Sequence, residues 1–418
     1  MSAPEADVVG QNPVAPVEPE PTGVAGLYRR SIDNLKSGNL GVLPIALGIV
    51  FIVVFFSFKA TNFFTANNFD NVIIQMAGTA MLAYGVVFVL LLGEIDLSIS
   101  YVAGIGAITV AELQLPGSGH VVNGLLAMVI AVVVCAVIGL VQGSIVAFVG
   151  VPSFVVTLAG FMIWQGVILQ VLEQKGSIII EDRWINYTAS YFFSAMAGWL
   201  IAGIITLIYA VTVVGGVIGK RRAAVAIGNP GLVVAKLIGV AVAAFGVVAI
   251  TNHAQVPHGL PLAGVLVVIF LVLLTFLAKR TTFGRHVYAV GGNAEAARRA
   301  GINVHRIRII VFMISGAMAA MGGIILAANV NSVDLNFGGG TLLLNAIAAA
   351  VIGGVSLFGG RGEVRGALLG AVLIGTLQNG LNTLNVSNGW IYIITGLVLL
   401  GAVTLDTVAV RLQARSGR

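Results

Sequence analysis

Two carboxylates beside long apolar runs are the least expected chemical groups in the sequence. The segment Gly93-Glu-Ile-Asp-Leu-Ser98 places Glu94 and Asp96 two positions apart, between two hydrophobic stretches. A carboxylate is expensive to bury in hydrocarbon, so one hypothesis is a proton or cation site. The other is structural, with Asp96 or Ser98 capping the start of the next helix. Residues two apart do not share a helix face, which favours the structural role.

The longest polar loop, residues 279–308, contains the pattern of a short capped helix. Asn293 is a good N-cap. Glu295 falls in the first turn and Arg298 in the last, as the helix dipole prefers. Gly301 can adopt the left-handed conformation that ends a helix. A compact helix of this kind is suited to lie in a groove of a partner protein, whereas the alternative is an ordinary connector.

A third candidate region is the glycine-rich stretch from Asn345 to Gly370, which predicts a tight or broken passage through the membrane or, alternatively, a flexible hairpin. Amides and hydroxyls also occur inside the apolar runs. They are candidates to line a pathway or to hydrogen-bond between helices. These residues are Gln75, Gln142, Ser153, Thr157, Gln165, Asn345, Gln378 and Asn379.

The signatures of enzymes that act on nucleotides, esters or peptides are absent from the sequence. No nucleotide-binding P-loop occurs, because Gly219-Lys220 is followed by Arg221 and lacks the upstream glycine. No nucleophile elbow or zinc-protease motif is present, and the five histidines lack metal-ligand spacing. We therefore expect neither catalysis nor a cofactor or metal in this chain.

The elements that must position these groups are membrane helices. The chain has 418 residues, of which 58% are hydrophobic and only 9% charged, and its mean hydropathy is +1.03. Soluble domains carry about a quarter charged residues, so the bilayer is the solvent that fits this composition. The net charge of +6 sits in loops between apolar runs, which indicates membrane topology rather than nucleic-acid binding.

The hydrophobic runs predict an all-α, polytopic helix bundle of about 12 spans, within a range of 10–14. The third and tenth runs are short, which predicts broken or re-entrant segments. A disordered cytosolic tail (1–40) precedes the membrane domain (41–407), and a cytosolic tail (408–418) follows it. The predicted spans are 42–58, 71–93, 99–113, 122–148, 152–172, 193–218, 232–252, 260–278, 309–329, 341–358, 365–384 and 389–407.

Basic residues determine the expected orientation. If the N-terminus is cytosolic and every run crosses once, the outer segments hold only Lys59, Lys175 and Arg183, and Lys236 lies near a span start. All other basic residues then fall on the cytosolic side, as the positive-inside rule requires. Both termini are therefore expected in the cytosol.

Glycines spaced four apart are candidates for close helix–helix packing. Three such pairs lie inside the predicted spans: Gly139 with Gly143, Gly215 with Gly219, and Gly366 with Gly370.

Taken together, these segments resemble the branched-chain amino acid and monosaccharide family of ABC permeases, on its ribose/xylose side. The resemblance covers residues 40 to 405 and rests on four matching segments in the family's order. Glu94, where many ribose-type members have glycine, is most similar to the D-xylose permeases. The matching segments are Gly93-Glu-Ile-Asp-Leu-Ser98, Thr282-Phe-Gly-Arg285 with Tyr288-Ala-Val-Gly-Gly-Asn293, Ala296-Ala297 with Gly301-Ile302, and Ala348 to Gly362.

The resemblance implies a division of labour in a bacterial plasma membrane. Two permease chains form the pathway, cytosolic ATPase subunits bind ATP and Mg²⁺, and an extracytoplasmic protein delivers the sugar. The loop 279–308 would couple this chain to the ATPase, while Glu94, Asp96, Ser98, Asn345, Gln378 and Asn379 are structural or pathway candidates. The expected coupling residues are Gly284, Arg285, Gly292, Asn293, Glu295, Ala296, Ala297 and Gly301.

Two other functions stay open at this point. One is a proton-coupled secondary transporter in which Glu94 and Asp96 carry the proton. The other is a membrane scaffold without transport activity.

Overall fold

The computed structural model describes residues 43–115, 121–223, 230–255 and 259–415 of the chain. The tail predicted at 1–40 lies outside the described residues. Within them, eight helices are long and apolar enough to cross a membrane, and four shorter apolar helices accompany them. The chain is thus a polytopic helical membrane protein.

The helices follow the hydrophobic runs closely. Helix α16 continues beyond residue 407, where the C-terminal tail was expected to begin, and α7, α11 and the start of α13 were not anticipated as helical. The helices are α2 (Leu43–Lys59), α3 (Ala66–Leu91), α4 (Ile99–Leu113), α5 (Gly124–Ser144) with its π-helical extension η1 (Ile145–Val149), α6 (Ser153–Leu172), α7 (Arg183–Ser190), α8 (Ala195–Arg222), α9 (Pro230–Thr251), α10 (Leu262–Arg280), α11 (Thr282–Gly292), α12 (Ala294–Arg299), α13 (Val304–Val330), α14 (Leu342–Ile352), α15 (Val364–Thr383) and α16 (Asn388–Arg415).

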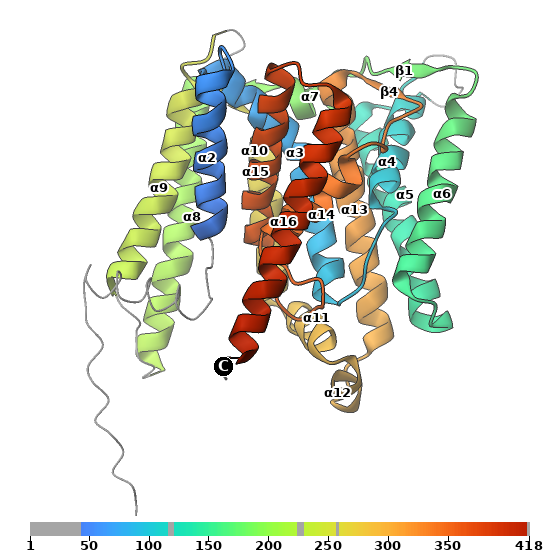
Figure 1. The fold of residues 1–418 in the computed structure, drawn as a ribbon, viewed down its shortest axis with the longest axis vertical. Helices are drawn as coiled ribbons and strands as arrows, with labels where there is room; N and C mark the ends of the chain where they lie inside the picture. Colours follow the sequence, from blue (N-terminus) through green and yellow to red (C-terminus); the bar gives the residue numbers. More distant parts are fainter. Residues whose placement is uncertain (1–42, 116–120, 224–229, 256–258, 416–418) are drawn as a thin grey trace, which may run out of the picture.

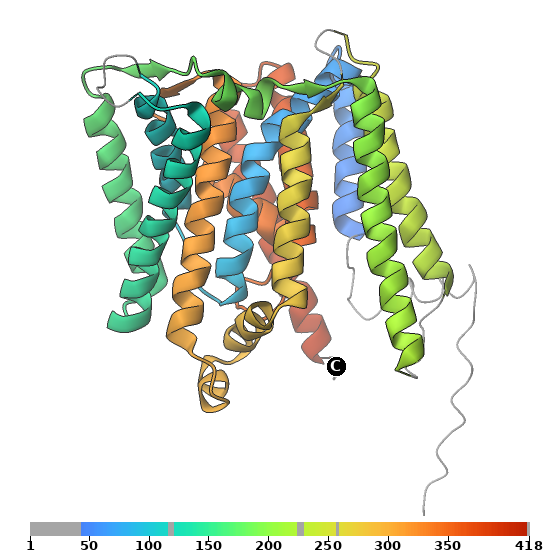
Figure 2. The same ribbon diagram turned by 180° about the vertical axis from the view of Figure 1, so that it is seen from behind.

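Among the described residues, four short strands accompany the helices without changing the predicted helical class. Strand β1 (Ser177–Ile179) pairs antiparallel with β4 (Ser332–Asp334), with Ile178 opposite Val333. Strand β2 (Phe192–Phe193) pairs antiparallel with β3 (Leu260–Pro261). The strands and α7 lie at one end of the bundle, which we call the strand end, and α11 and α12 lie at the other, the α12 end (Figure 1 and Figure 2). Such short runs carry too little alternation to be read from sequence.

Helix α13 is the centre of the bundle, and it packs against α3, α4 and α5. Small residues make this packing close. A Cβ on Gly143 would lie 3.0 Å from the Cα of Ile309, and Gly139 meets the backbone of Phe312 in the same way. The single cysteine, Cys135, is fully buried in α5, and its thiol donates to the carbonyl of Val102 at 3.3 Å.

The predicted pair Gly366 with Gly370 also packs closely, whereas the pair Gly215 with Gly219 does not. Gly366 and Gly370 of α15 contact the backbone of Gly353 and Ala349, so α14 and α15 lie close together. The pair on α8 (Gly215, Gly219) faces open space among the described residues. Helices α8 and α9 form a peripheral hairpin whose buried residues, among those described, are confined to its strand end (Figure 1).

Two helices inside the bundle, α4 and α14, are too short to cross a bilayer. With a rise of about 1.5 Å per residue, the 15 residues of α4 span roughly 22 Å and the 11 of α14 roughly 16 Å, against a hydrocarbon core of about 30 Å. The remaining depth is crossed by non-helical chain, residues 92–98 before α4 and 353–363 after α14 (Figure 1). Non-helical backbone is tolerated at membrane depth only where protein surrounds it.

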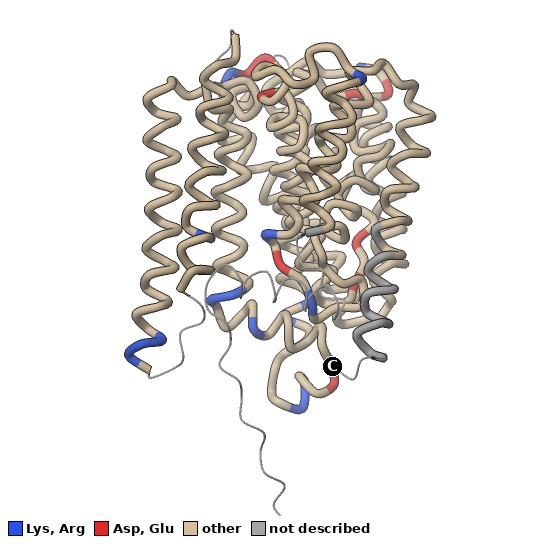
Figure 3. Tube along the Cα trace, turned by 60° about the vertical axis from the view of Figure 1, so that its left-hand side comes forward, with Lys and Arg blue, Asp and Glu red and all other residues tan. Residues whose placement is uncertain are grey.

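Charged residues gather near the two ends of the bundle, with a small group further inside (Figure 3). This distribution is the one expected of a membrane protein, because the cost of a charge is lowest near the interfaces.

Candidate functional site

Residues 92–98, which we call the α3–α4 linker, are held by a buried hydrogen-bond centre at Asp96. Its Oδ1 accepts from the backbone N–H of Ser98 at 3.0 Å and from the Ser98 hydroxyl at 2.7 Å. Its Oδ2 accepts from the hydroxyl of Ser315 on α13 at 2.8 Å. Asp96 is 7% exposed and both serines are fully buried. The carboxylate therefore ties the linker both to the start of α4 and to the central helix.

Two further helices bind the same linker. On α6, Ser153 accepts the N–H of Ile95 at 3.1 Å, and the hydroxyl of Thr157 donates to the Ile95 carbonyl at 3.1 Å. On α5, the Oε1 of Gln142 lies 3.0 Å from the Ser98 hydroxyl. A linker without its own ladder of backbone hydrogen bonds thus obtains partners from α5, α6 and α13, as buried backbone requires.

Glu94 points to a different partner from Asp96. The Nε of Arg308, in the first turns of α13, lies 3.0 Å from Oε1 of Glu94, and the two side chains are 28% and 14% exposed. The approach is an ion pair by distance, although the N–H of Arg308 does not aim at the carboxylate as a hydrogen bond. The two carboxylates of the linker are thus engaged with separate groups and form no acid–acid pair.

We expect this ion pair to contribute modestly to stability. Replacing Glu94 or Arg308 by glutamine should each lower the free energy of unfolding by about 1–2 kcal/mol, because the pair is only partly shielded from water. A double-mutant cycle measured by thermal unfolding in detergent tests this: the double variant should lose less than the sum of the single losses. Strict additivity would show that the two side chains do not interact.

A cavity of about 160 Å³ adjoins the linker on its other side. Its walls come from α3 (Val86, Val89, Leu90), the linker (Ile95, Asp96) and the region of α14 (Ile347, Leu357). Asp96 is its only polar lining residue among the described residues. Both non-helical segments of the bundle therefore border one mostly apolar space.

At the α12 end, α11 and α12 form a compact unit. Thr281 caps α11 by accepting the N–H of Gly284 at 3.1 Å. A Cβ on Gly284 would overlap the carbonyl of Ala278, so glycine allows α11 to fold back tightly on the end of α10. This helix occupies the first half of the loop, where the sequence predicted none.

The short helix expected from the sequence is α12. Asn293 caps it by accepting the N–H of Ala296 at 2.9 Å. Glu295 forms ion pairs with Arg298 at 2.7 Å and Arg299 at 3.1 Å. Hydrogen bonds from these two arginines lower the pKa of the Glu295 carboxyl. Gly301 has φ +84°, the left-handed value predicted for the end of this helix.

The two alanines of α12 face opposite ways. Ala297 is 5% exposed and belongs to the main hydrophobic core, whereas Ala296 is exposed. Arg285 and Gly292 are also exposed, and a Cβ on Gly292 would meet open space. The unit is thus anchored through Ala297 and presents Ala296 and the arginines outward.

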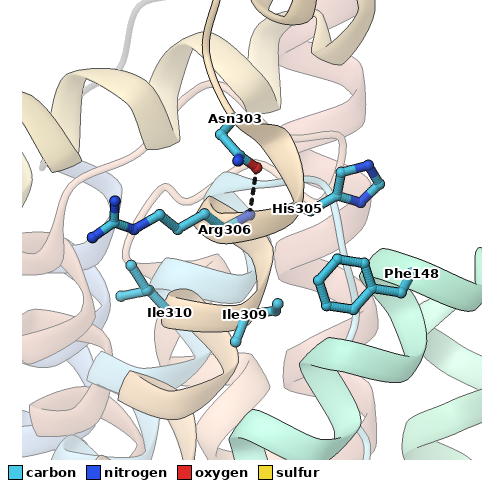
Figure 4. A pocket seen from close by; sticks show the side chains of 6 residues that line it. All are labelled: Phe148, Asn303, His305, Arg306, Ile309 and Ile310. Atoms are coloured by element: carbon cyan, nitrogen blue, oxygen red, sulfur yellow. Dashed lines mark hydrogen bonds between the residues drawn. The ribbon is translucent and has the colours of Figure 1, made fainter.

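A groove of about 450 Å³ lies directly beside this unit, between η1 and the start of α13. Figure 4 shows the ring of His305 over that of Phe148, with centroids 5.5 Å apart, and the Arg306 side chain extending away from them. Asn303 caps α13 by accepting the N–H of Arg306 at 3.0 Å. Ile309 and Ile310 complete the lining, so the groove offers aromatic, aliphatic and cationic surface together.

The three amide candidates form a separate network between α3, α14 and α15. Asn345 and Gln378 both approach the hydroxyl of Thr341, at 3.1 and 3.4 Å. Asn379 accepts from Asn68 at 2.8 Å and donates to Gln75 at 3.3 Å. The Asn345 contact lies within the start of α14, whereas those of Gln378 and Asn379 join different helices, and no hydrogen bond among the described residues joins any of them to the Asp96 centre. No three His, Cys, Asp or Glu side chains of the described residues gather as metal ligands.

Sequence reasoning missed two residues that hold the α3–α4 linker. Both lie in α13: Ser315 belongs to the run 309–329, which was assigned from its hydropathy, and Arg308, at the end of the loop 279–308, was used only as a cytosolic basic residue. A signal was present, since a hydroxyl inside an apolar run and an arginine at its start are both candidates to satisfy a buried carboxylate.

The fold defines the chain as a multi-pass helical membrane protein, with buried non-helical segments of the kind found in transporters. It belongs to the family described as the branched-chain amino acid transport system permease component, whose model matches residues 68–403. Membership places the chain among transport permeases rather than enzymes.

Several permeases are similar over nearly their whole length. The chain is 34% identical over 384 residues to the xylose transport system permease protein XylH of Escherichia coli, covering 91% of this chain and 95% of the relative. It is 32% identical over 388 residues to the protein of the same name in Haemophilus influenzae, covering 90% and 98%. It is also 32% identical over 360 residues to the ribose import permease protein RbsC of Escherichia coli, covering 86% and 92%. No solved structure matches the chain.

Proposed function

We propose that this chain is the membrane-spanning subunit of an ATP-driven importer in a bacterial plasma membrane, and that it carries a monosaccharide. D-xylose or a related pentose is the substrate we favour, since the similar permeases are named for xylose and ribose. A neutral sugar needs no charged site, in keeping with the few charges inside the bundle (Figure 3). An extracytoplasmic binding protein delivers the sugar, and a second copy of the chain completes the pathway.

The observation that carries this proposal is the α11–α12 unit. It is a capped, compact projection anchored by Ala297, and it has the exposed groove of Phe148 and Arg306 beside it. The sequence has no P-loop, so in this proposal a separate protein hydrolyses ATP and binds such a projection. We assign the outward face of α12, together with this groove, as the docking surface for the ATPase.

The distribution of basic residues supports a cytosolic location for α12, where an ATPase would bind. Helix α8 ends at the α12 end with Lys220, Arg221 and Arg222, and α10 ends there with Lys279 and Arg280. Basic residues favour the cytosolic side, so we place the α12 end in the cytosol. Helix α2 runs toward the strand end and α16 ends at the α12 end (Figure 1), so in this proposal both ends of the membrane domain face the cytosol.

Reconstitution tests the proposal directly. The chain is placed in proteoliposomes with the ATPase subunit and the binding protein of its transport system, and uptake of labelled D-xylose is measured. ATP should raise the initial rate of xylose uptake by at least about tenfold over ADP, a ratio that corresponds to roughly 1.4 kcal/mol. Unlabelled ribose, galactose and xylose then compete, and their order of potency identifies the preferred sugar.

A crosslinking arm tests the docking surface. A photo-crosslinker at Ala296 should capture the ATPase, and one at Phe64, which is 81% exposed at the strand end, should not. Uptake driven by a proton gradient in the absence of any ATPase would overturn the proposal, and so would capture from Phe64 but not from Ala296.

A further inference from the structure

Three separate segments, two loops and the end of a helix, meet backbone to backbone between the α11–α12 unit and the membrane bundle. They are the start of the α3–α4 linker at Gly93, the end of α11 at Gly291, and the α14–α15 loop at Gly359 and Gly360. We call these four residues the glycine contact. The N–H of Gly360 donates to the carbonyl of Leu91 at 2.9 Å, which fixes the loop against the end of α3.

The glycine contact leaves no room for a side chain. A Cβ on Gly291 would overlap the carbonyl of Leu91 and lie 2.8 Å from the nitrogen of Gly360. A Cβ on Gly359 would lie 2.7 Å from the Gly291 oxygen and 2.9 Å from the Gly93 nitrogen. Each approach is closer than a Cβ can make to a backbone atom, so the three segments cannot shift independently without separating or colliding.

Side chains hold the same three parts together around the glycine contact. The hydroxyl of Tyr288 on α11 donates to the carbonyl of Gly362 at 2.8 Å, and burial raises the pKa of this tyrosine, which keeps the donor protonated. Lys279, at the end of α10, pairs with Glu363 at 3.0 Å, and its ammonium lies 5.0 Å from the centre of the Tyr288 ring. Helix α11 is therefore bonded to the α14–α15 loop by Tyr288, and the end of α10 is joined to the same loop by Lys279.

Two of the segments that meet here are non-helical chain inside the bundle. Residues 92–98 carry Asp96, and residues 353–363 complete the depth that α14 leaves uncrossed. Both border the cavity of about 160 Å³ lined by Leu90, Asp96 and Leu357. Non-helical chain has fewer backbone hydrogen bonds to break than a helix, so it is the part of a bundle that a small displacement can move.

We propose that the glycine contact is the joint through which the docked α11–α12 unit moves the two non-helical segments, with Gly291, Gly359, Gly360 and Tyr288 as positioning residues of transport. The inference rests on the proposed function, because it needs an ATPase gripping α12. Rigid backbone contact passes a displacement of α11 directly to residues 93 and 359, and so to the walls of the cavity.

The test separates docking from transmission. Gly291→Ala and Gly359→Ala are reconstituted with the ATPase and binding protein, and three quantities are measured: co-purification of the ATPase, ATP hydrolysis and sugar taken up per ATP. Both variants should retain the ATPase and hydrolyse ATP, while uptake per ATP falls at least about tenfold, as misplacement at a distance can cause. Tyr288→Phe, which removes only one hydrogen bond, should lower the same ratio a few-fold with unchanged co-purification.

Gly216→Ala on α8 is the matched control, since its Cβ would meet open space, and it should transport as the unaltered chain does. Normal uptake per ATP in both Gly291→Ala and Gly359→Ala would overturn the proposal that the glycine contact transmits motion. If a glycine variant fails to fold, normal coupling in Tyr288→Phe overturns it by itself. An unaltered chain that never co-purifies with an ATPase would instead defeat the proposed function, which keeps the two failures distinct.

Discussion

Replacing Asp96 by leucine should lower the free energy of unfolding by about 3–5 kcal/mol, the range seen when one partner of a buried charged network is removed. Leucine is similar in size but accepts no hydrogen bond. The Ser98 N–H and the Ser315 hydroxyl would lose their acceptor inside the bundle, and the Ser98 hydroxyl would keep only Gln142. The linker would be released from α13, and we expect little folded protein to survive extraction from the membrane.

The milder variant Asp96→Asn should cost about 1–2 kcal/mol, because the amide oxygen still accepts from Ser98 while its NH₂ can donate to Ser315. Thermal stability in detergent, followed by gel filtration, gives the order unaltered chain, then asparagine, then leucine. Glu181→Leu, at an exposed acid, serves as the control and should unfold at the unaltered temperature. If the Asp96→Leu variant unfolded at the same temperature as the unaltered chain, the hydrogen bonds of Asp96 would not stabilise the fold.

Replacing Gly301 by valine should abolish most transport while the protein still inserts and folds. Gly301 has φ +84°, and a β-branched residue in that conformation costs about 1–2 kcal/mol or more. The turn that ends α12 would be forced to change, and the helix would present a different face to the ATPase. We expect co-purification of the ATPase and uptake to fall together, by at least about tenfold.

The neighbouring position supplies the matched control. Ala300 is exposed and has φ −79°, which valine adopts without strain, so Ala300→Val should transport normally. Ala297→Phe tests the anchoring side of the same helix, because a ring cannot fit where Ala297 is buried in the core. Full transport in both Gly301→Val and Ala297→Phe would refute the docking role of α12.

Much of the architecture could be predicted from hydropathy, because the bilayer leaves few alternatives to the helix. The two short helices were expected from the lengths of their apolar runs, and α4 has the predicted bounds, 99–113. The glycine pairs were less decisive. Gly139 with Gly143 packs against α13, whereas Gly215 with Gly219 faces open space, and nothing in either pair distinguishes the two outcomes locally.

The features of the candidate sites that could be predicted are those that depend on residues close together in the sequence. The cap of α12 at Asn293 and its end at Gly301 depend on neighbours in the chain, so residue types alone predicted them. The partners of Asp96 could not be found in this way, because Ser315 is 219 positions away in the sequence. The glycine contact depends on three segments meeting in space, and no pattern along one segment indicates it.

The separation of the two linker carboxylates bears on the alternative of proton coupling. A proton relay needs groups that can pass a proton between them or to water. Glu94 is engaged with Arg308 near the α12 end, and Asp96 is enclosed by serine hydroxyls. Structural engagement of both groups accounts for their presence beside hydrocarbon without a transported ion.

The burial of Cys135 has a practical consequence for watching this protein move. Its thiol is sealed between α5 and the Val102 carbonyl, out of reach of aqueous reagents, and the sequence holds no second cysteine. The natural chain therefore already behaves as a background free of reactive thiols. Pairs of cysteines introduced on α12 and at the strand end can therefore carry spectroscopic labels. Cys135 need not be replaced first, so the close packing of α5 against α4 stays unaltered.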